Sequence, residues 1–296
     1  MSMNNLTGIF IVAISLLLAV TAPAQKLTRD QIEQAIEKDG CVVTEEGTVK
    51  ICKFDYKYKG QNVEAWTFRP AQEGRYPAVM LIPGHEGTAK SFATFGIIFA
   101  RLGFASLSVG TPGFGKTELK ADFLGKRTIN AYITGYKTFA RESFVDKDKI
   151  AVFGYSRGAI AASLMITRIK NVKAAVLGGG VYDLKKAYDE LTIKGIKENI
   201  KTETGLTDKA FKERSSVFHM KNLNCPVLII HGENDTNAPT NQAYLLRDKL
   251  KELNKDFEFL ILADHRHGFF KGSFINPVAD FLSRKLKGEP LRSKIT

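Results

Sequence analysis

The sequence predicts an α/β fold, in which one doubly wound, mostly parallel sheet of eight strands is covered by helices and carries a short helical cap. Three observations predict it. Apolar, β-branched runs recur along the 296 residues, helix-compatible segments alternate with the later runs, and about 45 residues interrupt the alternation between Gly180 and Pro226. A chain of this length that is 44% hydrophobic can bury a full core.

The N-terminal segment has the pattern of a secretory signal. A polar start is followed by an apolar run over residues 9–20, and small residues stand at Ala22 and Ala24. We expect a signal peptide over residues 1–24 and a mature protein that is periplasmic or secreted, with no stable membrane association after cleavage. The start holds no Lys or Arg, which leaves an uncleaved anchor as the alternative, although the run is shorter than the ~20 residues of a membrane span.

The formal charge of +12 belongs to the mature protein, because residues 1–25 hold no charged side chain. The lysines are scattered through segments such as residues 185–214, where they are interleaved with Glu and Asp, as on solvated helix faces. We therefore expect no nucleic-acid partner.

Two of the three cysteines lie in "CVVTEEGTVKIC". If Glu46 and Gly47 form a two-residue hairpin turn, counting outward by pairs brings Cys41 opposite Cys52. Opposed antiparallel positions lie within disulfide range, and the bond would persist in an exported protein. The sequence thus predicts this bridge, and it predicts Cys225 as a small buried hydrophobe at the start of a strand.

The strand candidates differ along the chain. They cover residues 49–58, 61–70, 76–84, 104–110, 149–156, 172–180, 226–232 and 257–264. The first two alternate, as in an antiparallel edge, and the later six are nearly continuous, as in parallel strands buried on both faces. Helical patterns cover residues 90–102, 125–141, 157–169, 240–254 and 276–287. We expect one domain over residues 25–296.

An insertion of about residues 183–221 contains two amphipathic helical patterns. An ordinary crossover between parallel strands needs only a dozen or more residues. The excess predicts a cap over the carboxyl edge of the sheet, where ligands bind in such folds.

The strand at residues 149–156 runs into Gly154-Tyr155-Ser156-Arg157-Gly158 and then into a helical segment. Gly-x-Ser-x-Gly between a strand and a helix is typical of a nucleophile elbow, a strained turn that needs small neighbours. Ser156 is the candidate nucleophile. The alternative is a helix-capping serine without chemistry.

A serine nucleophile needs a base and an acid that orients the base. Asp235 follows the strand at residues 226–232, with Glu233 as the fallback acid. His265 and His267 follow the last strand and are both candidates for the base. The order along the chain is Ser, Asp, His.

Acyl transfer also needs two N–H donors for the oxyanion. One is expected from the backbone of Arg157, directly after the nucleophile. The other is expected from the loop "IPGHEGTAK", where Gly84 allows a tight backbone path and precedes the N–H of His85.

With these motifs in place, the chain resembles an α/β-hydrolase. From about Tyr58 to Leu286 it is similar to the catalytic domain of the prolyl oligopeptidase family and to dienelactone-hydrolase-like esterases, chiefly through the elbow, "HGENDTNAP" and "HGF". The resemblance implies Ser156 as nucleophile, Asp235 as acid and His267 as base, and it implies the α/β-hydrolase fold. Arg157 departs from the pattern, since those peptidases usually have an aromatic residue there.

The resemblance implies a serine hydrolase whose substrate is a small molecule. Carboxylic esters are the expected class, because only about 50 residues separate the signal from the sheet, too few for the propeller that gates prolyl oligopeptidases. No stretch is an evident binding site for a peptide terminus. The alternative is a serine peptidase acting on short peptides.

The stretch "VGTPGFGKTE" matches a phosphate-binding loop from Gly110 to Thr117. It follows the fourth strand, however, where α/β-hydrolases commonly have a Gly-rich turn, and the strand before Asp264 is needed for the histidine loop. We expect no nucleotide. The five histidines and three cysteines lack metal-site spacing, so we expect neither a metal nor another cofactor.

Overall fold

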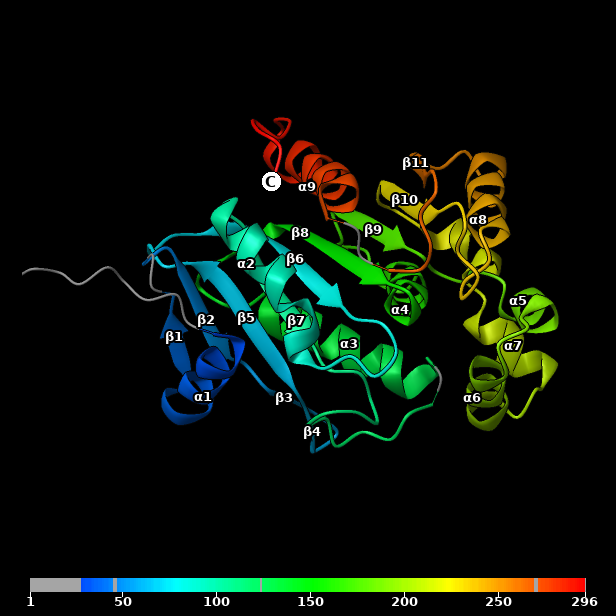
Figure 1. Ribbon diagram of the computed structural model, residues 1–296, viewed down its shortest axis with the longest axis horizontal. Coiled ribbons are helices and arrows are strands. Elements are labelled where there is room, and N and C mark those ends of the chain that lie inside the picture. The colour runs from blue at the N-terminus through cyan, green and yellow to red at the C-terminus, as the bar shows by residue number, and fades with distance from the viewer. Residues whose placement is uncertain (1–27, 45–46, 123, 269–270, 296) are drawn as a thin grey trace, which may run out of the picture.

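The computed structural model describes residues 28–44, 47–122, 124–268 and 271–295 (Figure 1). The expected signal peptide, residues 1–24, lies outside these residues. Among the residues described, no helix is both long enough and apolar enough to cross a membrane.

One large sheet forms the centre of the molecule (Figure 1). Its strands are β1 (Cys41–Val43), β2 (Val49–Lys53), β5 (Ala65–Pro70), β6 (Tyr76–Ile82), β7 (Ala105–Val109), β8 (Val145–Tyr155), β9 (Ala174–Gly178), β10 (Val227–Gly232) and β11 (Phe257–Leu262). The spatial order is β1-β2-β5-β7-β6-β8-β9-β10-β11. Strands β6 to β11 pair in parallel, while β1, β2 and β5 form an antiparallel edge. The predicted α/β fold with a mostly parallel sheet is confirmed.

The predicted number of strands is wrong, because within the described part of the chain the large sheet has nine strands and a separate hairpin has two. The hairpin consists of β3 (Tyr56–Tyr58) and β4 (Gln61–Val63). Asp55 explains the break: its carboxylate accepts hydrogen bonds from the Ala65 backbone N–H at 2.9 Å and from the Asn62 side-chain amide at 3.3 Å. This interruption divides both of the first apolar runs, and β1 adds the ninth strand.

Helices cover both faces of the large sheet. They are α2 (Ala93–Arg101), α3 (Lys126–Phe139), α4 (Arg157–Ile166), α8 (Asn241–Glu252) and α9 (Lys271–Lys287). Side chains alternate along β6, so Met80 packs in the cluster with α3, α4 and α8, and Leu81 packs in the cluster with α2 and α9. The five predicted helices are therefore present and bury the parallel strands from both sides.

One further helix, α1 (Arg29–Asp39), was not predicted. Thr28 and Gln31 form a reciprocal capping box at its start, and Gly40 ends it with φ of 75°. Ile36 is fully buried against the antiparallel edge. The T-x-x-Q pattern followed by glycine is the signal that predicts this helix.

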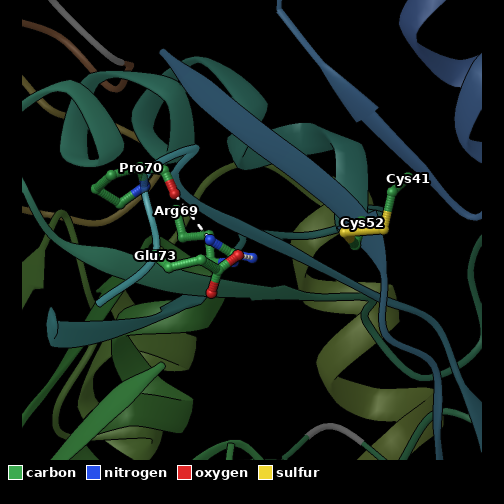
Figure 2. The surroundings of a disulfide bond; sticks show 5 residues. All are labelled: Cys41, Cys52, Arg69, Pro70 and Glu73. Atoms are coloured by element: carbon green, nitrogen blue, oxygen red, sulfur yellow. Dashed lines mark hydrogen bonds and ion pairs between the residues drawn. A yellow bond between two sulfur atoms is a disulfide. The ribbon is translucent and has the colours of Figure 1, made fainter. Parts of the chain in front are cut away.

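The antiparallel edge contains the predicted disulfide. Cys41 pairs in register with Cys52, and their sulfur atoms are bonded (Figure 2). The bond joins β1 to β2 and confirms the predicted pairing, although Glu46 of the predicted turn lies outside the described residues. Cys225 is buried as a free thiol, as predicted, and burial raises its pKa to about 12.

Three helices follow β9 and precede β10 along the chain, and they gather at one end of the sheet (Figure 1). They are α5 (Leu184–Glu190), α6 (Lys194–Thr204) and α7 (Asp208–Arg214), and two short 3₁₀ turns, Ser216–Phe218 and Met220–Asn222, lead back to the sheet. This segment, which we call the cap, brings α6 beside the turn that follows β8.

Candidate active site

Ser156 lies in the sharp turn between β8 and α4. Its φ of 55° and ψ of −126° are strained for a residue with a side chain. A Cβ atom on Gly158 would lie 2.0 Å from the Ile82 carbonyl oxygen, and one on Gly154 would lie 2.1 Å from the Gly158 carbonyl oxygen. Only glycine fits on both sides, so the sequence forms the elbow and presents a half-buried Ser156 at the start of α4.

His267 lies between Ser156 and Asp235. The Ser156 hydroxyl donates to Nε2 of His267 over 2.8 Å, and Nδ1 of His267 donates to Oδ2 of Asp235 over 2.7 Å. Asp235 follows β10 and His267 follows β11, so neighbouring parallel strands deliver both residues to one edge of the sheet. The hydrogen bonds form a continuous chain from hydroxyl to carboxylate.

The Asp235 carboxylate is nearly inaccessible, with 1% of its side chain exposed. Its Oδ1 atom accepts hydrogen bonds from the backbone N–H groups of Asn237 and Ala238, both at 2.9 Å. These bonds orient the carboxylate so that its other oxygen, Oδ2, accepts the hydrogen bond from His267.

Buried His231 supports the same loop. Its Nε2 atom donates to the Ala238 carbonyl oxygen over 2.8 Å and lies 3.5 Å from Oδ2 of Asp235. The pKa of His231 is lowered, principally by burial and further by the nearby His267. His231 is therefore neutral near pH 7 and packs beneath the acid loop.

The two fallback residues lie elsewhere. The ring of His265 donates to the Ala263 carbonyl oxygen over 2.6 Å and accepts from the Ser273 hydroxyl over 2.9 Å. Glu233 accepts from the backbone N–H of Asp264 over 3.3 Å. The structure therefore brings His267 and Asp235 to Ser156.

Tyr155 fixes the histidine loop in place. Its hydroxyl donates to the Gly268 carbonyl oxygen over 2.8 Å and accepts from the Gly268 N–H over 2.6 Å. The centre of its ring lies 5.3 Å from that of His267, and burial raises the pKa of the phenol. Sequence reasoning missed this contact, for which the aromatic residue beside the nucleophile is the signal.

The loop expected to stabilise the oxyanion approaches the nucleophile closely. A Cβ atom on Gly84 would lie 3.2 Å from Cβ of Ser156 and 3.6 Å from its Oγ atom. Thr111 braces this loop, because its hydroxyl donates to the Gly84 carbonyl oxygen over 3.2 Å. His85 and Arg157 both line the cavity that contains Ser156.

In the segment that matches a phosphate-binding loop, Lys116 and Thr117 contact other residues of the protein. The Thr117 hydroxyl accepts from the Glu64 N–H over 3.1 Å, and the Glu64 carboxylate accepts from the Lys116 N–H over 3.3 Å. The ammonium group of Lys116 pairs with Glu37 at 2.6 Å. The Lys116 ammonium and Thr117 hydroxyl that a phosphate-binding loop uses thus have protein partners here.

A cavity of about 490 Å³ opens above Ser156. Its apolar wall comes from the core and the cap together: Ile160, Val181, Leu184, Leu191, Ile196 and Ile200. Its polar side includes His85, Glu86 and Asn199. Over the residues that the structure describes, no group of three or more His, Cys, Asp or Glu side chains is placed to hold a metal ion.

The side chain of Arg157 contacts the cap. Its guanidinium donates two hydrogen bonds to the Glu203 carboxylate, at 3.0 and 2.6 Å, and Nη1 lies 3.1 Å from Nδ1 of His85. Burial and then the nearby Arg157 charge lower the pKa of His85. No local sequence pattern links Arg157 or His85 to Glu203, so the sequence predicts a role for the backbone N–H groups of these two residues but not for their side chains.

Comparison with known proteins agrees with this geometry. The model of the prolyl oligopeptidase family matches residues 98–289, which is more than half of the chain. "Uncharacterized peptidase YtmA" of Bacillus subtilis (strain 168) is 29% identical over 227 residues, covering 75% of this chain and 87% of YtmA. The chain spans about a third of the length of three further curated relatives.

Two solved structures, one of a peptidase and one of an esterase, show the same fold as this chain. A Mycobacterium tuberculosis puromycin-hydrolyzing peptidase superposes with a TM-score of 0.73 at 22% identity, covering 82% of this chain and 40% of the other. An acetyl xylan esterase from Paenibacillus sp. R4 superposes with a TM-score of 0.70 at 16% identity, covering 81% of this chain and 85% of the other. The fold is therefore shared by a peptidase and by an esterase.

Proposed function

Because the chain belongs to the prolyl oligopeptidase family and is a serine hydrolase, we propose that it cleaves carboxylic esters through an acyl intermediate on Ser156. The observation that carries this proposal is the hydrogen-bond chain from Ser156 through His267 to Asp235, at the floor of a largely apolar cavity. Each of the three residues takes the role that its geometry suits.

His267 acts as the general base. Its Nε2 atom removes the proton from Ser156 as Oγ attacks the ester carbonyl carbon, and the buried Asp235 stabilises the resulting imidazolium. His267 then gives that proton to the departing alkoxide, which leaves as the alcohol. A water molecule repeats the sequence on the acyl-enzyme, and the products are the carboxylic acid and free Ser156.

The carbonyl oxygen becomes negatively charged in both steps. We assign its stabilisation to the backbone N–H groups of His85 and Arg157, two residues that line the cavity together with Ser156. The close approach of Gly84 to Ser156 supports this assignment, because it brings the loop before His85 within contact distance of the nucleophile.

An uncharged substrate suits the cavity best. Burial of the apolar wall against an acyl chain is favourable, whereas a charged acyl group needs an opposite charge when it is desolvated. Arg157, the cation in the cavity wall, is already paired with Glu203. A small-molecule ester with an apolar acyl group is therefore the proposed substrate.

A short peptide is the alternative substrate. The similarity to YtmA, whose name describes a peptidase, favours it. Glu86 is the carboxylate that lines the cavity, and its largely exposed side chain would face a substrate amine. Peptidase activity would therefore be directed at substrates with a free amino group.

We also propose that the protein works outside the cytoplasm, in the periplasm or as a secreted enzyme. A disulfide such as Cys41–Cys52 persists in oxidising compartments and is rare in the cytosol. The signal pattern in residues 1–24 supports the same location.

Matched substrates test the proposed chemistry. An ester and an amide that share one uncharged acyl group should differ in kcat/KM, with the ester preferred, and a fluorophosphonate should label the protein at Ser156. Ser156→Ala should lose labelling and on the order of a millionfold in turnover. Preference for a dipeptide amide over the ester would favour the peptidase, and activity in Ser156→Ala would refute the mechanism.

A further inference from the structure

Helix α6 of the cap forms part of the substrate wall. Ile196, Asn199 and Ile200 of this helix line the cavity above Ser156. Together with Glu203 they occupy positions i, i+3, i+4 and i+7, which is one face of a helix. That face therefore points toward the active site, and its position sets the space available to an acyl chain.

Two polar contacts connect this face to the catalytic core. The Arg157 guanidinium forms a two-point ion pair with Glu203, and only 7% and 13% of the two side chains are exposed. One turn earlier, the Asn199 side-chain amide lies 3.2 Å from Nε2 of His85. His85 in turn contacts Arg157, so the four side chains form one network between α6 and the residues beside Ser156.

The ion pair is specific in geometry and costly to break. A planar guanidinium binds both oxygens of a carboxylate in a single orientation, which fixes distance and angle together. Removing one charge leaves the other desolvated without its partner. The α6 face can therefore move away from the cavity only if Arg157 and Glu203 separate or travel together.

The apolar contacts of α6 at the cavity depend on the position in which the ion pair holds this helix. Ile200 is 2% exposed and packs in the large hydrophobic cluster, while Ile196 is only half-buried at the cavity. A small outward movement of α6 would enlarge the far part of the cavity and leave Ser156 and His267 in place. Long acyl chains would lose contacts, and an acetyl group would lose few.

We propose that the Arg157–Glu203 ion pair, with His85 and Asn199, holds α6 over the cavity and thereby determines which acyl chain lengths the enzyme prefers. Glu203 is a specificity-determining residue that acts through the position of α6. This inference rests on the proposed ester hydrolysis and adds the chain length of the acyl group to it.

The test compares Glu203→Gln with Glu198→Gln on the same helix. Glu198 is exposed and pairs with Lys201 at 3.8 Å, so its substitution removes the same charge outside the network. The probes are p-nitrophenyl acetate, butyrate and octanoate. The ratio of kcat/KM for octanoate to that for acetate should fall roughly 4- to 15-fold in Glu203→Gln, the equivalent of one or two buried methylenes. It should change less than about twofold in Glu198→Gln.

Hydrogen exchange of α6 gives a readout that does not depend on ester turnover. Backbone amides of residues 194–204 should exchange faster in Glu203→Gln than in Glu198→Gln. If Glu203→Gln does not fold, Glu203→Asp keeps the charge with a shorter reach and should show a smaller change in the same direction.

Two results would overturn the inference separately from the proposed function. Equal exchange of α6 in both variants would mean that the ion pair does not hold this helix in position. A parallel loss of activity on all three esters would mean that Glu203 only stabilises the fold. Absence of both hydrolysis and fluorophosphonate labelling in the unsubstituted protein would instead reject the proposed function, and the chain-length inference with it.

Discussion

The hydroxyl oxygen of Ser156 lies 2.8 Å from Nε2 of His267, on the ring whose other nitrogen lies 2.7 Å from the Asp235 carboxylate. These distances fall in the range in which a general base accepts a proton directly. His265 is two residues away in sequence and has its ring committed to Ala263 and Ser273. The two histidines are therefore structurally unequal.

Alanine substitutions should separate the two histidines. His267→Ala should lower kcat/KM on the order of 10⁴-fold or more, because it removes the proposed base. His265→Ala should change it only a few-fold, through the loop that it braces. Steady-state kinetics on one ester measures both, and a comparable loss in the two variants would contradict the assignment of His267.

The space beside Ser156 predicts a different pair of variants. Gly84→Ala places a Cβ atom 3.2 Å from Cβ of Ser156, so the loop or the nucleophile must shift by a few tenths of an ångström. We expect kcat/KM to fall roughly 10- to 100-fold with little change in melting temperature. Gly195→Ala is the control, because no atom lies within 4 Å of the added carbon. Normal activity in Gly84→Ala would argue against an oxyanion site there.

The sequence predicts best those parts of the molecule that depend on patterns within short, continuous stretches of residues. Six nearly unbroken apolar runs predict the parallel strands, and the order of Ser156, Asp235 and His267 after three of them predicts that the side chains meet at one edge. In the sequence alone, the preference for His267 over His265 rests on a family resemblance, and it is their spatial contacts that distinguish the two histidines.

Other features depend on contacts between distant segments. Arg157 and Glu203 are 46 residues apart, and Glu203 is one of two glutamates in a lysine-rich helix. The division of the first apolar runs depends on side-chain bonds of Asp55 to residues 62 and 65. In both cases a polar side chain contacts a residue that the hydrophobic periodicity of the sequence does not identify.

Tyr155→Phe should weaken catalysis through the histidine loop. It removes both hydrogen bonds to the backbone of half-buried Gly268, at a cost of about 1 kcal/mol for each bond. We expect a lower kcat on matched esters and a lower melting temperature, with labelling by fluorophosphonate slowed but retained. Unchanged kcat would show that the loop holds His267 without this contact.

Loss of the disulfide should destabilise the protein while leaving the site chemistry intact. The bond closes a loop with a sequence separation of 11, and such a cross-link contributes about 3 kcal/mol. The double variant Cys41→Ser, Cys52→Ser should show this loss in urea unfolding. Reductant should lower the stability of the unsubstituted protein only, since Cys225 is already a free thiol in both. Equal sensitivity of both proteins would contradict the prediction.

Burial of His231 predicts how stability depends on pH. Its pKa in the folded protein is lowered, chiefly by burial and also by His267, while Asp235 and the bond to Ala238 oppose the shift. Between this lowered pKa and the ordinary value of about 6.5, the unfolded chain binds more protons than the folded one. The free energy of unfolding should therefore fall as the pH drops below about 6.5, by at most ~1.4 kcal/mol per pH unit for this one group.

The variant His231→Gln tests that dependence. Glutamine cannot titrate, and its side-chain amide can still donate to the Ala238 carbonyl oxygen, so the slope of stability against pH below 6.5 should become shallower even if the variant is less stable overall. His219→Gln is the matched control, because half-buried His219 also lies 3.1 Å from a carbonyl oxygen, that of Lys212. Urea unfolding between pH 7 and pH 5 measures the slopes. An unchanged slope in His231→Gln would mean that other groups account for the loss of stability in acid, among them His85, whose pKa is also lowered.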